Sequence, residues 1–149
     1  MHYLLKQFWE WIPVSYEEYS KKGITQIHGN YEDDFPKINE LIEYGKKIVA
    51  DNLTSDNYID DLLTIMGIDN EAEEIMEYIE ENSSDEQINR LISIGVNHSL
   101  YDTRWQVAEL LYRRKPQRYA EFLKILSSDS NMYVRKRAMN CIKMINHEL

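Results

Sequence analysis

The sequence predicts an all-α protein, a short right-handed superhelix of stacked helical hairpins behind an aromatic N-terminal segment. Three observations predict it. Apolar residues recur at three- and four-residue spacing along most of the chain, as on one face of a helix. The connections between these segments are short. Alternate segments recur about every thirty residues, as in repeat proteins. With 149 residues, the chain is expected to form one domain, 1–149.

The first 35 residues hold eight of the seventeen aromatic residues: Tyr3, Phe8, Trp9, Trp11, Tyr16, Tyr19, Tyr31 and Phe35. We expect this segment, 1–35, to be a cap that covers the open end of the helical array. An exposed aromatic arm for a partner is the alternative. Strand-like alternation occurs only around 24–31, and there it is weak.

Residues 36–149 are expected to form the helical hairpins. Apolar periodicity predicts helices at 36–50, 56–67, 71–82, 85–97, 102–114, 117–127 and 131–146. Pro36 and Pro116 suit a first helical turn, and Ser84 with Gln87 forms a capping box. Further candidate N-caps, all with a short side-chain oxygen, are Asp69 or Asn70, Asp102, and Asp129 or Ser130.

The spacing of these helices indicates a two-helix repeat. Alternate helices open at Ile59, Ile88 and Tyr119, which are 29 and 31 residues apart. The intervening helices are marked by Ala72, Arg104 and Val134, which are 32 and 30 residues apart. Each such hairpin is too thin to bury its own apolar face, so we expect stacked neighbours to supply the core.

The stretch DSNMYVRKRAMNCI, which begins at Asp129, resembles the first helix of a HEAT repeat. The residues that carry the resemblance are Asp129, Val134, Arg135, Ala138 and Ile142. The stretch YDTRWQVAELL (101–111) resembles a degenerate preceding copy, with Trp105 at the position of Arg135. The resemblance implies an α-solenoid and leaves the function open.

Three consecutive basic residues, Arg135, Lys136 and Arg137, fan through about 200° of a helix and do not line one face. The HEAT resemblance implies that Arg135 bonds an acidic residue or a carbonyl of a neighbouring repeat. We expect Lys136 and Arg137 to be solvated. A small basic patch with residues 113–118 is the alternative, and it would favour nucleic-acid binding.

Composition and motifs indicate no catalytic or metal-binding role. None of the four histidines forms an HExxH motif, and the five glycines form no phosphate loop. The single Cys141 lies on an apolar helix face and is expected to be an inert buried thiol. We therefore expect a protein that is not an enzyme and that needs no cofactor.

The N-terminus lacks the basic region and cleavage site of a secretory signal, and no apolar stretch approaches the ~20 residues that span a bilayer. The sequence therefore predicts a cytoplasmic protein without a membrane partner.

Charge divides the chain into two parts. Residues 1–89 hold 6 Lys/Arg against 21 Asp/Glu, a balance of −15, and residues 90–149 hold 11 against 5, a balance of +6. The segment DNEAEEIMEYIEEN (69–82) is the most acidic. We predict a partner-binding surface here, formed by Asp60, Asp61, Glu73, Glu74, Glu77, Tyr78 and Glu81. A merely solubilising face is the alternative.

A small, acidic helical-repeat protein without catalytic motifs is similar to the immunity proteins of bacterial toxin systems. The similarity implies binding to a basic toxin domain, such as a nuclease, and blockage of its active site or substrate groove. A general adaptor or regulatory scaffold is the second hypothesis. A nucleic-acid-binding repeat protein is the third, and the acidic balance of the whole chain argues against it.

Overall fold

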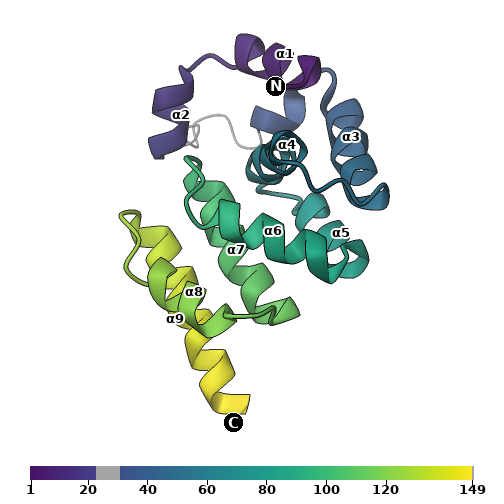
Figure 1. The fold of residues 1–149 in the computed structure, drawn as a ribbon. Coiled ribbons are helices and arrows are strands. Elements are labelled where there is room, and N and C mark those ends of the chain that lie inside the picture. Colours follow the sequence, from purple (N-terminus) through teal and green to yellow (C-terminus); the bar gives the residue numbers. More distant parts are fainter. Residues whose placement is uncertain (23–30, 149) are drawn as a thin grey trace.

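The computed structural model describes residues 1–22 and 31–148. These residues form nine α-helices and one 3-10 helix without any strand (Figure 1). In chain order they are α1 (Tyr3–Trp11), α2 (Tyr16–Lys22), η2 (Tyr31–Asp34), α3 (Ile38–Ala50), α4 (Asp56–Ile68), α5 (Glu74–Asn82), α6 (Asp85–Gly95), α7 (Tyr101–Arg114), α8 (Tyr119–Leu126) and α9 (Met132–Glu148). The prediction of an all-α protein is confirmed. The strand-like alternation at 24–31 lies outside the described residues, apart from Tyr31.

Each of the seven predicted helices corresponds to one helix from α3 to α9. The largest difference is at the start of α5, which begins at Glu74 and not at residue 71. Glu73 has the left-handed backbone conformation, with φ of 56°. Ala72 is exposed, although the apolar pattern predicted that it would face inward. The Asp69 carboxylate accepts a hydrogen bond of 2.8 Å from the backbone N–H of Ile75. Asp69 therefore caps α5 across a turn that periodicity does not reveal.

The helix α7 is the centre of the molecule and contacts helices on both sides (Figure 1). Its most extensive contacts are with α9 and α4, and it also packs against α5, α6 and α8. Nine of its fourteen residues are buried, including polar Thr103 and Gln106. Because α7 is covered on nearly every side, its apolar stripe is wider than that of a surface helix.

The helices α4 and α5 follow one another in the chain, but neither is the main neighbour of the other. The helix α4 packs mainly against α3 and α7, whereas α5 packs mainly against α3. Gly45 permits the approach of α3 and α5, because a Cβ atom there would lie 2.8 Å from Cδ1 of Ile75. On the other side of α4, the Thr103 hydroxyl of α7 donates to the Leu63 carbonyl at 2.9 Å.

The starts of α7 and α9 are built alike, 31 residues apart. The Arg104 guanidinium donates to the carbonyls of His98 and Ser99, and the Arg135 guanidinium donates to those of Asp129 and Ser130. By these bonds the counterpart of Arg135 is Arg104, whereas the sequence pattern places Trp105 at that position.

The N-terminal aromatic residues pack on one another next to α3 and η2. Phe8, Tyr19 and Phe35 are buried, and the Phe8 ring meets both of the others edge to face. Tyr3 and Tyr16 are exposed. The Tyr19 hydroxyl donates to the Glu32 carboxylate at 3.0 Å, which links α2 to η2. This segment is thus mostly a small aromatic core with a few exposed rings.

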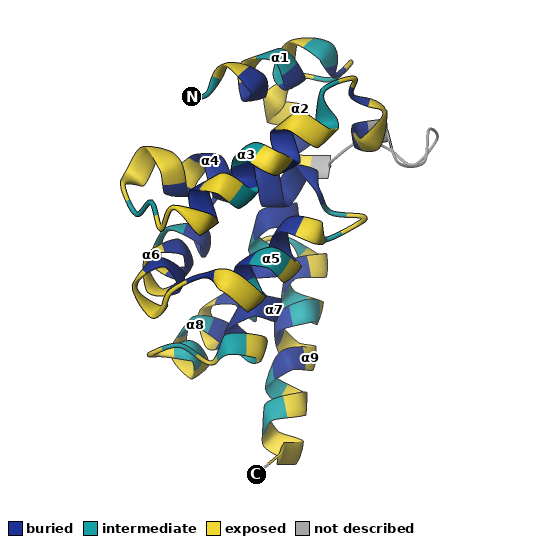
Figure 2. Ribbon diagram, turned by 90° about the vertical axis from the view of Figure 1, so that its right-hand side faces the viewer, coloured by how far each residue is buried: buried dark blue, intermediate teal, exposed yellow. Residues whose placement is uncertain are grey.

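Buried residues line the inner faces of α3, α4 and α5 and most of α7, whereas the outer faces of α5 and α8 are exposed (Figure 2). Val134, Ala138 and Cys141 face inward from α9, as the apolar pattern predicted, and Ile142 is partly buried. Among the described helices, none combines the length and the apolar character that crossing a bilayer requires.

Candidate partner-binding surfaces

The helix α5 presents an acidic stripe to solvent, which we define as Glu74, Glu77 and Glu81. These residues are three and four positions apart, so their side chains lie on one face. All three are exposed, whereas Ile75, Met76 and Ile79 on the opposite face are buried. Tyr78 lies half-buried beside the stripe. Four of the residues predicted to bind a partner, Tyr78 and the three carboxylates, are therefore brought together.

The side of α5 that faces α3 is held by one lysine. The Lys46 ammonium lies 2.5 Å from the Glu74 carboxylate and 5.6 Å from the centre of the Tyr78 ring. The hydrogen bond to Glu74 raises the pKa of Lys46. Glu74 is therefore partly neutralised by its own molecule. Within the described part of the chain, no cation lies within ion-pair distance of Glu77 or Glu81.

The side of α5 that faces α7 is held by two arginines. Arg113 pairs with Glu80 at 3.1 Å. The Arg114 guanidinium donates to the carbonyls of Ile79, Glu80 and Ser83, at 3.0 to 3.3 Å. These carbonyls belong to the last turn of α5, where backbone acceptors lack partners within the helix. Arg114 therefore fixes the C-terminal end of α5, where the acidic stripe ends, against α7.

Asp61 does not contribute to this surface, and its prediction as a partner-binding residue was wrong. It is only 7% exposed, and it accepts a hydrogen bond of 2.7 Å from the Tyr44 hydroxyl. Burial and this hydrogen bond raise the pKa of Tyr44. The role of Asp61 is to join α4 to α3.

Glu73 also differs from the predicted arrangement. It is half-buried, and its left-handed backbone forms the turn into α5. Its carboxylate precedes the helix and is not one of the stripe positions.

Asp60 is exposed but belongs to a different part of the surface. Its carboxylate lies 3.4 Å from Nε2 of His98, in the loop between α6 and α7. Contact with His98 lowers the pKa of Asp60. The Thr64 hydroxyl lies 3.2 Å from the same nitrogen, and Nδ1 of His98 accepts from the Leu100 N–H.

This group of Asp60, Thr64 and His98 is not a catalytic relay. In a hydroxyl–imidazole–carboxylate relay, the hydroxyl and the carboxylate occupy opposite ring nitrogens. Here both approach Nε2, and the Thr64 hydroxyl already donates to the Asp60 carbonyl at 2.8 Å. The three residues therefore link α4 to the loop before α7.

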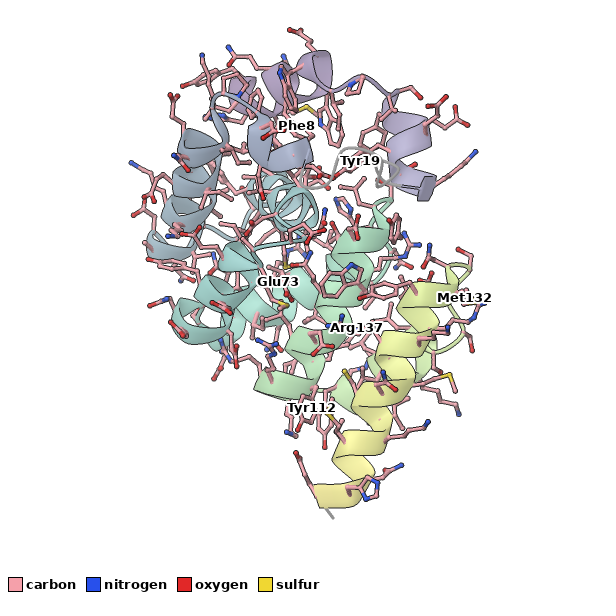
Figure 3. All side chains as sticks on the ribbon, turned by 180° about the vertical axis from the view of Figure 1, so that it is seen from behind. Phe8, Tyr19, Glu73, Tyr112, Met132 and Arg137 are labelled. Atoms are coloured by element: carbon pink, nitrogen blue, oxygen red, sulfur yellow. The ribbon has the colours of Figure 1, made fainter. Side chains whose placement is uncertain are left out.

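The contacts of the three consecutive basic residues of α9 differ from those predicted from the sequence. Arg135 bonds the carbonyls before its own helix and not a neighbouring repeat. Arg137, predicted to be solvated, pairs with Glu109 of α7 at 2.7 Å, and its guanidinium lies 4.3 Å from the centre of the Trp105 ring. Figure 3 shows Arg137 between the two helices. Lys136 is exposed, as predicted.

Trp105 and Asp129 each bond a side chain of α7. The Trp105 ring is buried, and its N–H donates to the Asp102 carboxylate at 2.8 Å. Asp129 accepts two hydrogen bonds from Arg104, of 2.8 and 3.1 Å. This bidentate pair joins the start of α7 to the loop before α9.

Seven of the eleven Lys and Arg residues in 90–149 are engaged by carboxylates of the same molecule. The pairs are Arg90 with Asp56, Arg104 with Asp129, Arg113 with Glu80, Arg114 with Asp85, Lys115 with Glu148, Arg118 with Glu121, and Arg137 with Glu109. Most of the positive charge of residues 90–149 is therefore paired with carboxylates of the same molecule.

Three carboxylates are buried where the N-terminal segment meets α4 and α7. Burial raises the pKa of Asp69 and of Asp102 to about 6, and it also raises the pKa of Glu32. Asp102, a predicted N-cap, is the second residue of α7 and is 9% exposed. These groups bond Ile75, Trp105 and Tyr19, so each has a structural role.

Among the described residues, no group of three His, Cys, Asp or Glu side chains could hold a metal ion. Cys141 is buried, and burial raises its thiol pKa to about 12. A thiol with such a pKa is a poor nucleophile.

Comparison of the chain with protein-family models, with curated proteins and with solved structures finds no match. The functional argument therefore depends on the surfaces described above.

Proposed function

We propose that the protein is a small binding module with the architecture of a short right-handed α-solenoid of HEAT-like hairpins. The succession of α4, α7 and α9 supports this architecture, as do the equivalent bonds of Arg104 and Arg135. In this proposal the N-terminal aromatic segment is the cap of the array. Its buried rings of Phe8, Tyr19 and Phe35 support that assignment.

The proposed activity is that of an immunity protein, which binds a basic toxin domain, such as a nuclease, in the cytoplasm and blocks its active site or substrate groove. The acidic stripe of α5 carries the proposal. Glu77 and Glu81 are one helical turn apart, and like charges at this spacing destabilise a helix by about 0.2–0.5 kcal/mol. A basic partner would relieve this repulsion and would be drawn to the stripe over a long range.

The charge distribution favours a protein partner over a nucleic acid. Binding to a phosphate backbone requires a surface of free Lys and Arg side chains. Most arginines of residues 90–149 are paired within the molecule, and the exposed stripe of α5 would repel phosphates.

The decisive experiment is neutralisation of a toxin in living cells. The protein encoded by the reading frame next to this one would be produced alone and together with this chain, and growth would be measured. We expect growth arrest without this chain and recovery with it. Recovery should fail with Glu77→Lys/Glu81→Lys, which changes two exposed side chains that make no ion pair in the described structure.

A matched control is Glu10→Lys/Glu18→Lys, which makes the same change of charge at exposed positions of α1 and α2. Equal loss of recovery in both variants would indicate a general effect of net charge. Full recovery with the α5 variant would show that the toxin binds elsewhere.

A general adaptor is the second candidate function. It is favoured by a second surface of opposite charge, on α8 and α9, because an adaptor needs two binding sites and an inhibitor needs one.

A further inference from the structure

The helices α8 and α9 form an apolar groove between them. The groove has a volume of about 250 Å³ and is lined by Ala120, Leu123, Lys124, Ile142, Ile145 and Asn146. Its floor is aliphatic, and its polar lining residues carry no acid. Small-molecule sites usually measure about 300–1,000 Å³, so this groove suits the side chains of a docked segment better than a separate ligand.

The helix α9 also carries an exposed stripe outside the lining of the groove. Met132, Lys136, Met139 and Lys143 follow one another at spacings of four, three and four residues, so they lie on one face of the helix. All four are exposed, and the methionine side chains are 60% and 49% exposed. Figure 3 shows Met132 at the outer edge of the molecule, away from α7. Exposed methionines are typical of adaptable binding surfaces.

Three lysines of α8 and α9, of which Lys124 lines the groove, are basic residues that the molecule does not use internally. Of the eleven Lys and Arg residues in 90–149, only Lys124, Lys136 and Lys143 have no carboxylate or carbonyl partner in the described part of the chain. All three are exposed on α8 and α9, next to exposed apolar side chains.

The acidic residues of these two helices do not compensate the lysines. α8 contains only Glu121 and α9 only Glu148, and they pair with Arg118 and Lys115. The groove therefore combines an apolar floor with an uncompensated positive rim.

We propose that this groove docks an acidic amphipathic helix of a partner protein. Apolar side chains at three- and four-residue spacing would enter the groove over Leu123, Ile142 and Ile145. Carboxylates on the flanks of the docked helix would meet Lys124 and Lys143. The site is separate from the acidic stripe of α5 and carries the opposite charge.

A second copy of this chain is a poorer occupant of the same site. A symmetric dimer through this face would bring the lysine rims of both copies together. Like charges placed opposite one another at an interface oppose association.

The test uses a fluorescent probe peptide of about 16 residues, roughly four helical turns, with leucines along one face and glutamates on its flanks. Two control peptides replace the glutamates by lysines or scramble the order. Fluorescence anisotropy with the full chain measures affinity at low and high salt. We expect the acidic peptide to bind at least about tenfold more tightly than either control, and the difference to shrink at high salt.

Two variants alter the groove in different ways. Lys124→Glu/Lys143→Glu removes the positive rim and should weaken binding of the acidic peptide at least about tenfold at low salt. Ala120→Gln fills the groove from an exposed helical position and should weaken binding at both salt concentrations. The matched controls Lys6→Glu/Lys47→Glu and Ile125→Gln change exposed residues outside the groove and should bind like the wild type.

Equal binding of acidic and basic peptides, or no binding of the acidic peptide, would overturn the proposal. So would wild-type affinity in both groove variants, or a loss of affinity in the matched controls. A wild-type dimer that Ala120→Gln dissociates, seen by sedimentation, would assign the face to a second copy instead. The variant Glu77→Lys/Glu81→Lys should still bind the peptide, which separates this test from that of the acidic stripe.

Discussion

The helices α5 and α9 are both amphipathic and both lie at the edge of the molecule, yet they use charged residues in opposite ways. In α9, Arg135 and Arg137 bond acceptors of the same molecule, and only the lysines are left to solvent. In α5, Glu77 and Glu81 have no cation within ion-pair distance in the described structure. The comparison teaches that the charge balance of a segment does not measure the charge of its surface. A charged side chain that is paired inside the molecule, such as Glu74 with Lys46, adds less to the charge of the surface than an unpaired one such as Glu77.

Among the substitutions that test this comparison of α5 with α9, Arg137→Ala is expected to have the largest effect on stability. Arg137→Ala should lower the free energy of unfolding by about 2–3 kcal/mol, because it removes the closest cation of the buried Glu109, which keeps only Arg113 at 4.0 Å, and because it removes a cation from the Trp105 ring. Urea denaturation measures the change. Lys136→Ala, the neighbouring control, should stay within about ±0.5 kcal/mol. Equal effects would mean that the α7–α9 ion pair adds no stability.

The buried carboxylate of Asp102 should make the stability of the protein depend on pH. Burial raises the pKa of Asp102 to about 6 in the folded protein, above its ordinary value of 3.8. Its contribution to stability is therefore fully present below pH 4 and is lost as pH rises through about 6. Asp102→Asn has no such group, so its stability relative to the wild type should increase by about 2 kcal/mol between pH 4 and 7.5.

Urea denaturation at several pH values measures this difference. A difference between Asp102→Asn and the wild type that is constant with pH would mean that Asp102 titrates alike in the folded and unfolded chains.

Arg135 should be less important than Arg137, although the HEAT resemblance singles it out. Arg135→Ala removes hydrogen bonds to two carbonyls near the surface, where water can replace them, and should cost about 1 kcal/mol. Thermal unfolding of the two alanine variants side by side measures the ranking. A larger loss for Arg135 would restore it as the main basic contact of α9.

The smallest effect concerns the acidic stripe itself. Glu77→Gln/Glu81→Gln removes the repulsion between two carboxylates one turn apart and should raise the free energy of unfolding by about 0.2–0.5 kcal/mol. The gain should fade as salt is added. Denaturation at low and high salt measures it, and a loss of stability would mean that these carboxylates have a structural partner.

Several site residues were predictable from the sequence, and others were not. The spacing of Glu74, Glu77 and Glu81 placed them on one outward face of α5. The same rule applied to Met132, Lys136, Met139 and Lys143 would have found the stripe on α9. Asp61 could not be assigned, because its partner Tyr44 comes from another helix, 17 residues away.

The sequence by itself determined the seven helices from α3 to α9, because helical periodicity and capping depend on residues a few positions apart. Helix pairing was decided only by the tertiary structure, where Gly45 lets α5 approach α3 and leaves α4 to α7. The tertiary structure also decided which charged residues pair with one another. The partners in the pairs of Arg104 with Asp129 and Arg137 with Glu109 are 25 and 28 residues apart. Such contacts depend on how the helices pack, and no local pattern contains that information.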